Sequence, residues 1–500
     1  MHPSTSELVR RLKAKDPTIW GPTGTPELAD RLGWIDLPKT MIPRLPEIGA
    51  AAAAALADRT DRVVLLGMGG SSLAPEVFAA VLGVAPGHPA LTVLDSTHPH
   101  QVGGVADSID PRRTLFIVSS KSGGTLETVS AFRYFWQLTG ADGSRFLAIT
   151  DPGSSLETMG RERGFRAVVT APSDVGGRFS ALTHFGLLPA ALIGADPQVL
   201  LAAAGEVSWT ESVEMGRQWA EAALAGRDKL TLVTSPGLAA FPAWMEQLVA
   251  ESLGKDGKGI VPVAGEPVLE GYGNDRLFVS YRLAGQARAD SPPGHEAIDR
   301  VVPDRYHLAT EMLAAEIATA VAGAILGVHP FNQPDVELAK QNARRALEGT
   351  TPRVETIDCF SPVLADRLEA LRASMRPGEY LGIHAYLPVE PSTDAVLAEL
   401  RRRLGDPSGN ATTTGYGPRF LHSTGQLHKG GPDNGLFLQL IDTPADDLPI
   451  PETDTTFGRV IASQAVGDFL ALRERGRRVL RVDLGADRAR GLATVLAALG

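Results

Sequence analysis

Glycine, serine and threonine residues gather at two places where an apolar run ends and a helical pattern begins. The first is Gly67-Met68-Gly69-Gly70-Ser71-Ser72, directly after residues 63–66, and the second is Ser119-Ser120-Lys121-Ser122-Gly123-Gly124-Thr125, directly after residues 115–118. At such a junction, free backbone N–H groups and the helix dipole attract an anion, and glycine lets the backbone approach it. Two junctions of this kind predict a phosphate-bearing ligand, although either one alone is as often an ordinary turn.

The glycine spacing argues against two common nucleotide sites. Gly67 and Gly69 begin a dinucleotide-binding fingerprint, but Ser72 stands where its third glycine belongs. A Walker loop needs Gly-Lys followed by Ser or Thr at the start of a helix, and no such tripeptide opens a helix here. The predicted ligand is therefore a small phosphorylated metabolite.

Length, charge and cysteine content limit the class of protein. Five hundred residues predict two or three domains. A net charge of −10, without a long basic run, argues against nucleic acid as a partner. The single cysteine, Cys359, excludes an internal disulfide and favours a reducing compartment. We expect a cytoplasmic protein without a membrane-spanning segment.

Strand and helix patterns alternate from residue 61 onward, which is typical of parallel sheets covered by helices on both faces. The expected fold class is α/β, with two doubly wound parallel-sheet domains followed by a C-terminal α/β domain. The predicted units are a helical lead-in at 1–55, a phosphate-binding domain at 56–198, a second sheet domain at 199–350 and the C-terminal domain at 351–500.

Five motifs between residues 60 and 340 resemble, in this order, those of glucose-6-phosphate isomerases, whose two domains are called sugar-isomerase (SIS) domains. They are Gly67-x-Gly69-Gly70-Ser71, Ser120-Lys121-Ser122-x-x-Thr125-x-Glu127-Thr128, Gly176-Gly177-Arg178-Phe179-Ser180, Glu251-Ser252-x-Gly254-Lys255 and Phe331-Asn332-Gln333-x-x-Val336-Glu337-x-x-Lys340. The resemblance implies conversion of an aldose phosphate into a ketose phosphate through a cis-enediol, with neither a metal nor another cofactor.

The resemblance also implies a role for individual residues. The phosphate ligands would be the hydroxyls of Ser71, Ser120, Ser122 and Thr125 with the backbone N–H groups of Gly70 and Lys121, and Gln247 and Gln333 would contact the substrate. Glu251 would move the proton between C1 and C2, Arg178 would stabilise the enediolate, and Lys340 would lie at the ring oxygen. Taken alone, a glutamate or lysine of this kind is usually a solvated surface residue.

One element of the family pattern is missing. The usual isomerases carry, after the base, a histidine that helps to open the sugar ring, and the equivalent stretch here has Asp275 or Arg276 in its place. Residues 415–432 resemble the end of bifunctional transaldolase/glucose-6-phosphate isomerases and contain two histidines. We expect His428, and less strongly His422, to serve ring opening from the C-terminal domain.

Several alternatives stay open at this point. The enzyme could also accept mannose 6-phosphate, or the chain could be a non-catalytic sugar-phosphate sensor, which would need the phosphate loops but not Glu251, Arg178 and Lys340. The resemblance also implies a homodimer, and a separate transaldolase could supply the other activity of the bifunctional relatives. His98 and His100 are spaced for a metal site, but no third ligand is evident and we expect no metal.

Overall fold

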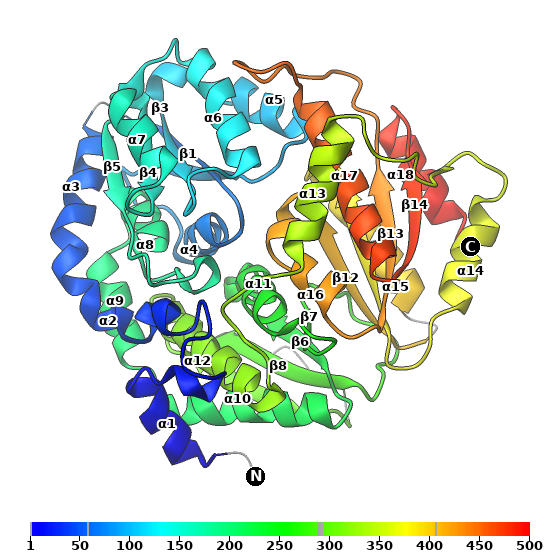
Figure 1. Cartoon of the computed structure of the whole chain (residues 1–500), viewed down its shortest axis with the longest axis horizontal. Helices are drawn as coiled ribbons and strands as arrows, with labels where there is room; N and C mark the ends of the chain where they lie inside the picture. The colour runs from blue at the N-terminus through cyan, green and yellow to red at the C-terminus, as the bar shows by residue number, and fades with distance from the viewer. Residues whose placement is uncertain (1–2, 58–59, 288–291, 293, 406–407) are drawn as a thin grey trace.

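The computed structural model describes residues 3–57, 60–287, 292, 294–405 and 408–500. It contains three parallel sheets arranged around a central helix, α11, with the third sheet packed beside the first two (Figure 1). The segment before the first sheet carries the helices α1 (Thr5–Lys13), α2 (Leu37–Thr40) and α3 (Leu45–Leu56). The predicted α/β class with parallel, doubly wound sheets is confirmed.

The first sheet has the strand order β2-β1-β3-β4-β5, with all strands parallel. Its elements are β1 (Arg62–Gly67), β2 (Ala90–Leu94), β3 (Thr114–Ser119), β4 (Phe146–Thr150), β5 (Ala167–Thr170), α4 (Leu73–Leu82), α5 (Pro99–Asp107), α6 (Leu126–Leu138), α7 (Ser155–Glu162) and α8 (His184–Leu192). Successive residues of β1 enter two different cores, Val63 and Leu65 on one face and Val64 and Leu66 on the other. Because both faces are buried, the strand is apolar throughout.

The second sheet has the order β7-β6-β8-β9 and is also parallel. Its elements are β6 (Lys229–Thr234), β7 (Val261–Val263), β8 (Arg276–Leu283), β9 (Ala297–Val302), α9 (Pro197–Gly205), α10 (Trp209–Leu224), α11 (Phe241–Leu253) and α12 (Leu308–Leu326). By length and composition α12 could cross a membrane, but 89% of its 18-residue apolar window is buried inside the protein. It is a core helix, and a Cβ on Gly216 of α10 would lie 2.3 Å from the backbone oxygen of Ala318.

The third sheet has the order β10-β14-β13-β11-β12. Its elements are β10 (Ile357–Asp358), β11 (Tyr380–Tyr386), β12 (Ala411–Tyr416), β13 (Gly435–Ile441), β14 (Arg478–Asp483), α14 (Leu364–Ala373), α15 (Pro391–Gly405), α16 (Gly425–Gly430), α17 (Phe457–Glu474) and α18 (Arg488–Ala497). Helix α13 (Val336–Leu347), which carries Lys340, lies along α17, so the two neighbouring helices come from either side of residue 350 (Figure 1).

The two predicted phosphate loops leave neighbouring strands. Gly67 at the end of β1 pairs with Ser119 at the end of β3, while β2 lies on the other side of β1. The chain therefore turns to opposite sides of the sheet after β1 and β3, and this switch point is where open α/β sheets bind ligands. It fixes the end of the sheet at which a site is expected.

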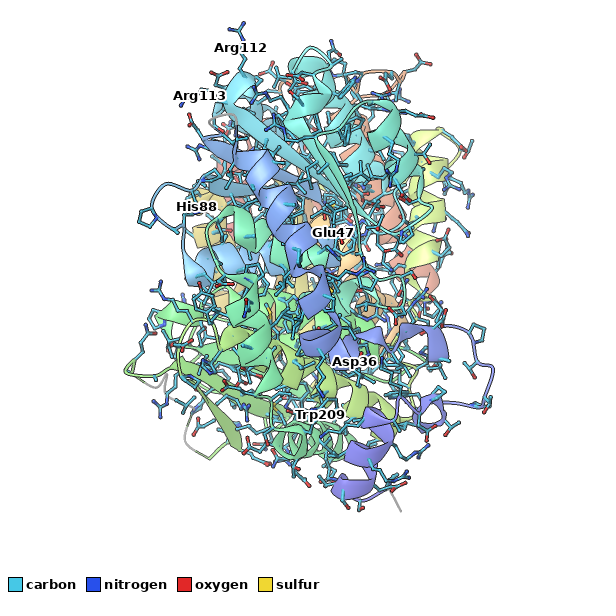
Figure 2. All side chains as sticks on the ribbon, turned by 90° about the vertical axis from the view of Figure 1, so that its left-hand side faces the viewer. Asp36, Glu47, His88, Arg112, Arg113 and Trp209 are labelled. Atoms are coloured by element: carbon cyan, nitrogen blue, oxygen red, sulfur yellow. The ribbon has the colours of Figure 1, made fainter. Side chains whose placement is uncertain are left out.

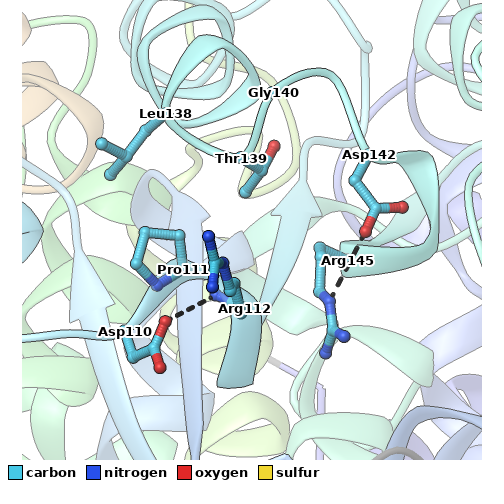
Figure 3. A pocket seen from close by; sticks show the side chains of 8 residues that line it. All are labelled: Asp110, Pro111, Arg112, Leu138, Thr139, Gly140, Asp142 and Arg145. Atoms are coloured by element: carbon cyan, nitrogen blue, oxygen red, sulfur yellow. Dashed lines mark hydrogen bonds and ion pairs between the residues drawn. The ribbon is translucent and has the colours of Figure 1, made fainter.

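A shallow hollow of about 400 Å³ lies at the other end of the same sheet (Figure 3). Asp110 and Arg112 in its wall precede β3, and Asp142 and Arg145 precede β4. Its charges are engaged locally, since Asp110 accepts from the backbone of Arg112 and Asp142 pairs with Arg145. Figure 2 shows Arg112 at the tip of the molecule, far from Trp209. This hollow is separate from the switch point.

Candidate active site

The loop after β1 is packed tightly against the loop that carries Arg178. A Cβ on Gly70 would lie 2.0 Å from the backbone oxygen of Gly177, so no other residue fits without movement of the backbone. Gly69 has a φ of +54°, and a Cβ there would lie 2.7 Å from the backbone oxygen of His422. Glycine at these two positions lets a loop of the first sheet touch both the Arg178 turn and the C-terminal domain.

The loop after β3 presents hydroxyl groups at the N-terminus of α6. The hydroxyls of Ser120 and Thr125 lie 3.0 Å apart, and Ser120 Oγ also accepts from the backbone of Gly123. Lys121 directs its ammonium away to Asp151, and its backbone N–H donates to no other described residue. Ser122 is exposed at the same turn, and Ser71 is buried on the neighbouring loop. The predicted phosphate ligands therefore lie on two adjacent loops at the switch point.

Arg178 and Glu251 form an ion pair with a separation of 3.0 Å. Arg178 lies in the turn after the first sheet, and Glu251 lies on α11 beside the second. The guanidinium is 4% exposed and the carboxylate 13%. Arg178 also donates to Ser252 Oγ at 2.9 Å and to the backbone oxygens of Pro330 and Asn332. Burial lowers the pKa of Arg178 from its ordinary value, opposed by the charge of Glu251. A guanidinium stays charged even so, and this one is held in a fixed orientation.

Gln247 connects Glu251 to the C-terminal domain. One turn of α11 separates the two residues, and Gln247 Nε2 donates to Glu251 Oε2 at 3.0 Å and to the backbone oxygen of His422 at 2.9 Å. The side chain is 3% exposed. A single amide therefore fixes the carboxylate and the loop that carries His422.

The loop at residues 329–333 is held by two buried cations. Lys255 Nζ donates to the backbone oxygens of His329 and Asn332, and Arg178 donates to Asn332 as well. Gln333, predicted to contact substrate, accepts from Arg178 at 3.1 Å through Oε1 and is otherwise exposed. Burial lowers the pKa of Lys255 well below its ordinary value, and the charge of Arg178 lowers it further.

His422 lies at the end of a short 3-10 turn (Arg419–His422) and reaches the first sheet domain. Its Nε2 is 2.8 Å from Oε1 of Glu127, in the first turn of α6. The His422 side chain is 22% exposed. Arg419 in the same turn pairs with Glu76 and with Asp95, the latter at 3.0 Å, and so anchors this turn to the first sheet domain.

The electrostatic surroundings favour an ionised pair. Burial lowers the pKa of His422, but the charge of Glu127 and their hydrogen bond outweigh it and raise the pKa above its ordinary value. Burial raises the pKa of Glu127, and His422 reverses this and holds it below its ordinary value. Lys340 acts on both groups and Glu251 acts on His422, so all four groups share one electrostatic environment.

His428 is not brought to this site. It is 4% exposed and packs against His384, with ring centroids 4.6 Å apart, and against Phe437. Burial lowers its pKa well below the ordinary value, as do the charges of His384 and Lys429. His422 lies in the loop that follows β12, at the carboxyl end of the third sheet. His428 lies on α16, which packs it against His384 of β11 instead. The structure therefore favours the second of the two expected histidines.

The residues at the position of the missing histidine are structural. Arg276 is 1% exposed and donates to Thr231 and to both oxygens of Glu266. Asp275 lies 3.4 Å from Lys229. His98 pairs with Asp442 at 3.0 Å, a contact between the first sheet domain and the third sheet. None of these side chains joins the group around Glu251.

Sequence reasoning did not single out Glu127, although the residue stands in one of the five motifs. A buried carboxylate in the first turn of a helix beside a phosphate loop is unexpected, and that was the available signal. Gln464 of α17, which donates to Glu127 at 2.7 Å, was also missed. No local pattern distinguishes it, because its importance depends on contact with a residue 337 positions away.

Comparison with known proteins agrees with the five motifs. Residues 48–260 match the family model described as phosphoglucose isomerase. A glucose-6-phosphate isomerase of Symbiobacterium thermophilum is 30% identical over 388 residues, covering 62% of this chain and 85% of the relative. The corresponding protein of Rubrobacter xylanophilus is 29% identical over 402 residues, covering 66% of this chain and 92% of the relative.

Solved structures show the same fold. A hypothetical protein from Thermus thermophilus is 26% identical, with a TM-score of 0.57, and covers 69% of this chain and 94% of its own. A glucose-6-phosphate isomerase from Chlamydia trachomatis is 18% identical, with a TM-score of 0.51, and covers 72% and 81%. Residues 261–500, with the whole third sheet, lie outside the match to the family model.

Proposed function

The chain belongs to the glucose-6-phosphate isomerase family and interconverts glucose 6-phosphate and fructose 6-phosphate, and on that premise we propose that Glu251 is the base of this reaction. The observation that carries the proposal is the placement of Glu251. Arg178 lies 3.0 Å from one of its oxygens and Gln247 lies 3.0 Å from the other. A carboxylate held on both sides has a defined orientation toward the substrate.

In this mechanism Glu251 removes the proton from C2 of open-chain glucose 6-phosphate and returns it to C1, by way of a cis-enediol. Negative charge develops on the substrate oxygens as the proton leaves carbon. Arg178 is already fixed by Ser252 and two backbone oxygens, so it stabilises that charge without reorganising. The phosphate binds to the hydroxyls and N–H groups of the two loops after β1 and β3.

We assign ring opening to His422, paired with Glu127, in place of the expected His428. A protonated His422 donates its Nδ1 proton to O5 as the C1–O5 bond of the glucose ring breaks, and Glu127 holds the other ring nitrogen. The proton of the anomeric hydroxyl leaves to solvent in the same step, so that C1 becomes the aldehyde carbon. The raised pKa of His422 supports this assignment, because it keeps the imidazolium populated near neutral pH. We propose that Lys340, on α13, also lies at the ring oxygen of the substrate.

Replacing Glu251 tests the base. Glu251→Gln keeps the size and polarity of the side chain but cannot accept a proton, so turnover of fructose 6-phosphate should fall roughly 10³-fold. The measurement is a dehydrogenase-coupled assay for glucose 6-phosphate, combined with calorimetric titration of sugar phosphate to show that binding persists. The matched control is Glu246→Gln, on the same helix.

Burial raises the pKa of Glu246 to about 7, so glutamine resembles its protonated form and activity should be retained. Turnover that survives in Glu251→Gln would show that another group is the base.

Replacing His422 tests ring opening. 5-Deoxyfructose 6-phosphate lacks the hydroxyl that closes the furanose ring, so its isomerisation needs no ring opening. His422→Asn should lose roughly 100-fold on fructose 6-phosphate and little on the deoxy analogue, with aldose formation followed by NMR. His428→Asn, which changes a core residue, should show no such discrimination. Equal losses on both substrates in His422→Asn would remove the ring-opening role.

Four further features remain proposals from sequence. A homodimer and a complex with a separate transaldolase are tested by light scattering of the chain alone and with that enzyme. Cytoplasmic location is proposed from the single cysteine, Cys359, which is buried. The coupled assay with mannose 6-phosphate tests the dual-isomerase alternative, which no described contact favours.

A further inference from the structure

Glu127 receives two hydrogen bonds from the C-terminal domain on the same oxygen. His422 Nε2 lies 2.8 Å and Gln464 Nε2 lies 2.7 Å from Oε1 of Glu127. Glu127 is 7% exposed and Gln464 4% exposed, so neither interaction is weakened by bulk water. The proposed catalytic pair is thus a group of three.

The orientation of the Gln464 amide is fixed by its partners. An ionised carboxylate only accepts hydrogen bonds, so the NH₂ group must face Glu127 and the amide oxygen must face the other way. There Thr97 Oγ1, from a fully buried residue after β2, donates to it at 2.8 Å. Both ends of the amide are therefore engaged by the first sheet domain.

Helix α17 holds Gln464 in register with α13. A Cβ on Gly467, one turn after Gln464, would lie 2.5 Å from the backbone nitrogen of Ala343 and 2.7 Å from the backbone oxygen of Ala339. These residues flank Lys340 on α13. The close approach of the two helices fixes Gln464 and the backbone of Lys340 relative to each other.

We propose that Gln464 is a positioning residue for ring opening. Gln464 orients Glu127 toward His422, and its amide donates to Oε1 of Glu127, the same oxygen that His422 binds. The proposal rests on the assignment of ring opening to His422 and Glu127. With the second donor in place, Glu127 Oε1 holds the His422 proton less firmly than a carboxylate with one donor would. The imidazolium thereby remains the stronger acid toward the substrate.

The charged groups around His422 come from three other elements. Glu127 lies on α6, Lys340 on α13 and Glu251 on α11, and each contributes to the electrostatic environment of His422. Gln464 carries no charge, so its replacement by a neutral side chain leaves this set unchanged. A shift in the pH profile would then report the lost hydrogen bond.

Gln464→Met tests the proposal, since methionine is similar in length but does not donate. Turnover of fructose 6-phosphate should fall roughly ten-fold, with little loss on 5-deoxyfructose 6-phosphate. The alkaline limb of kcat/KM for fructose 6-phosphate should move to higher pH by about half a unit, because Glu127 then binds the His422 proton without competition. Ser463→Ala, the neighbouring residue on α17 whose hydroxyl bonds the helix backbone, is the control and should behave as the parent.

Gln464→Glu provides an independent readout. When protonated, the new carboxyl donates to Glu127 as glutamine does, and when ionised it repels Glu127. Activity of this variant should therefore approach that of the parent at low pH and collapse as pH rises. Equal losses on both substrates with an unchanged pH profile would overturn the proposal. If His422→Asn loses more activity on fructose 6-phosphate than on the deoxy analogue and Gln464→Met does not, this inference alone is overturned. If neither variant distinguishes the two substrates, the assignment of ring opening to His422 is overturned as well.

Discussion

Gly70 and Gly177 meet backbone to backbone at the point where the phosphate loop touches the Arg178 turn. A side chain at position 70 has no room, because the atom it meets is a backbone oxygen rather than the end of a flexible side chain. The loop after β1 and the Arg178 turn can therefore approach this closely only because residue 70 has no Cβ.

Gly70→Ala should destabilise the protein by about 2 kcal/mol and abolish measurable sugar-phosphate binding, because overpacking forces the two loops apart. Urea unfolding and calorimetric titration measure the two effects. Gly104→Ala in α5 is the control, since a Cβ there meets nothing within 4 Å, and its stability should stay the same or increase. Normal binding by Gly70→Ala would show that the loops tolerate displacement.

The sequence predicted single residues unevenly. Ser71, Arg178, Glu251 and Lys340 could be proposed as site residues because each stands in a short motif. The sequence placed His428 before His422, whereas the geometry supports the proposal of His422. The two histidines share one glycine-rich segment, and only the path of the chain after β12 separates them. Gln464 could not be found, since its partners Thr97 and Glu127 are distant in sequence.

Among the elements, the short turn Arg419–His422 forms a charged contact between the third sheet and the first. Arg419 binds Glu76 and Asp95, and His422 binds Glu127. Buried charges in such a contact must be paired, because an unpaired one costs several kcal/mol. The contact of this turn with the first sheet domain therefore depends on the protonation of His422 and Glu127.

The stability contributed by His422 should depend on pH. Because its pKa is raised, its contribution is fully present below the ordinary value of 6.5 and is lost as pH rises through the folded-state pKa. The pKa of Glu127 is lowered, so its contribution is present above the ordinary value of 4.5 and is lost as pH falls through its folded-state pKa. The parent should exceed His422→Asn by about 1 to 3 kcal/mol between these values and by less on either side. Urea unfolding of both proteins across this range is the measurement, and a difference independent of pH would contradict it.

Most helices and central strands could be predicted, whereas the less regular strands could not. Strands β1, β3 and β13 are buried and apolar on both faces, a pattern visible in the sequence. The edge strand β9 alternates irregularly between exposed and half-buried residues, and β12 consists largely of threonine and glycine. Both are stabilised by pairing with a neighbouring strand, so their own residues carry little signal.

In the whole molecule, every residue proposed for the site comes from one chain. Phosphate ligands and Arg178 belong to the first sheet domain, Glu251 to the second, and His422 follows the third sheet. A homodimer, which the resemblance implies, would not be needed to complete this site.

Mixing two inactive variants tests this arrangement. If each site uses only its own chain, Glu251→Gln and His422→Asn should remain inactive when unfolded together and refolded as a mixture. If a histidine crossed between subunits, up to about a quarter of the parent's activity would return, because mixed dimers would contain one intact site. Recovery in the coupled assay would therefore contradict a site contained in one chain, and refolded parent serves as the control.

The position of His422 and Gln464 late in the chain has a consequence for synthesis. A ribosome synthesises the two phosphate loops and Glu251 well before it reaches α17, so the residues proposed for phosphate binding and proton transfer exist before Gln464 does. The group of Glu127, His422 and Gln464 can therefore form only after α17 has been synthesised.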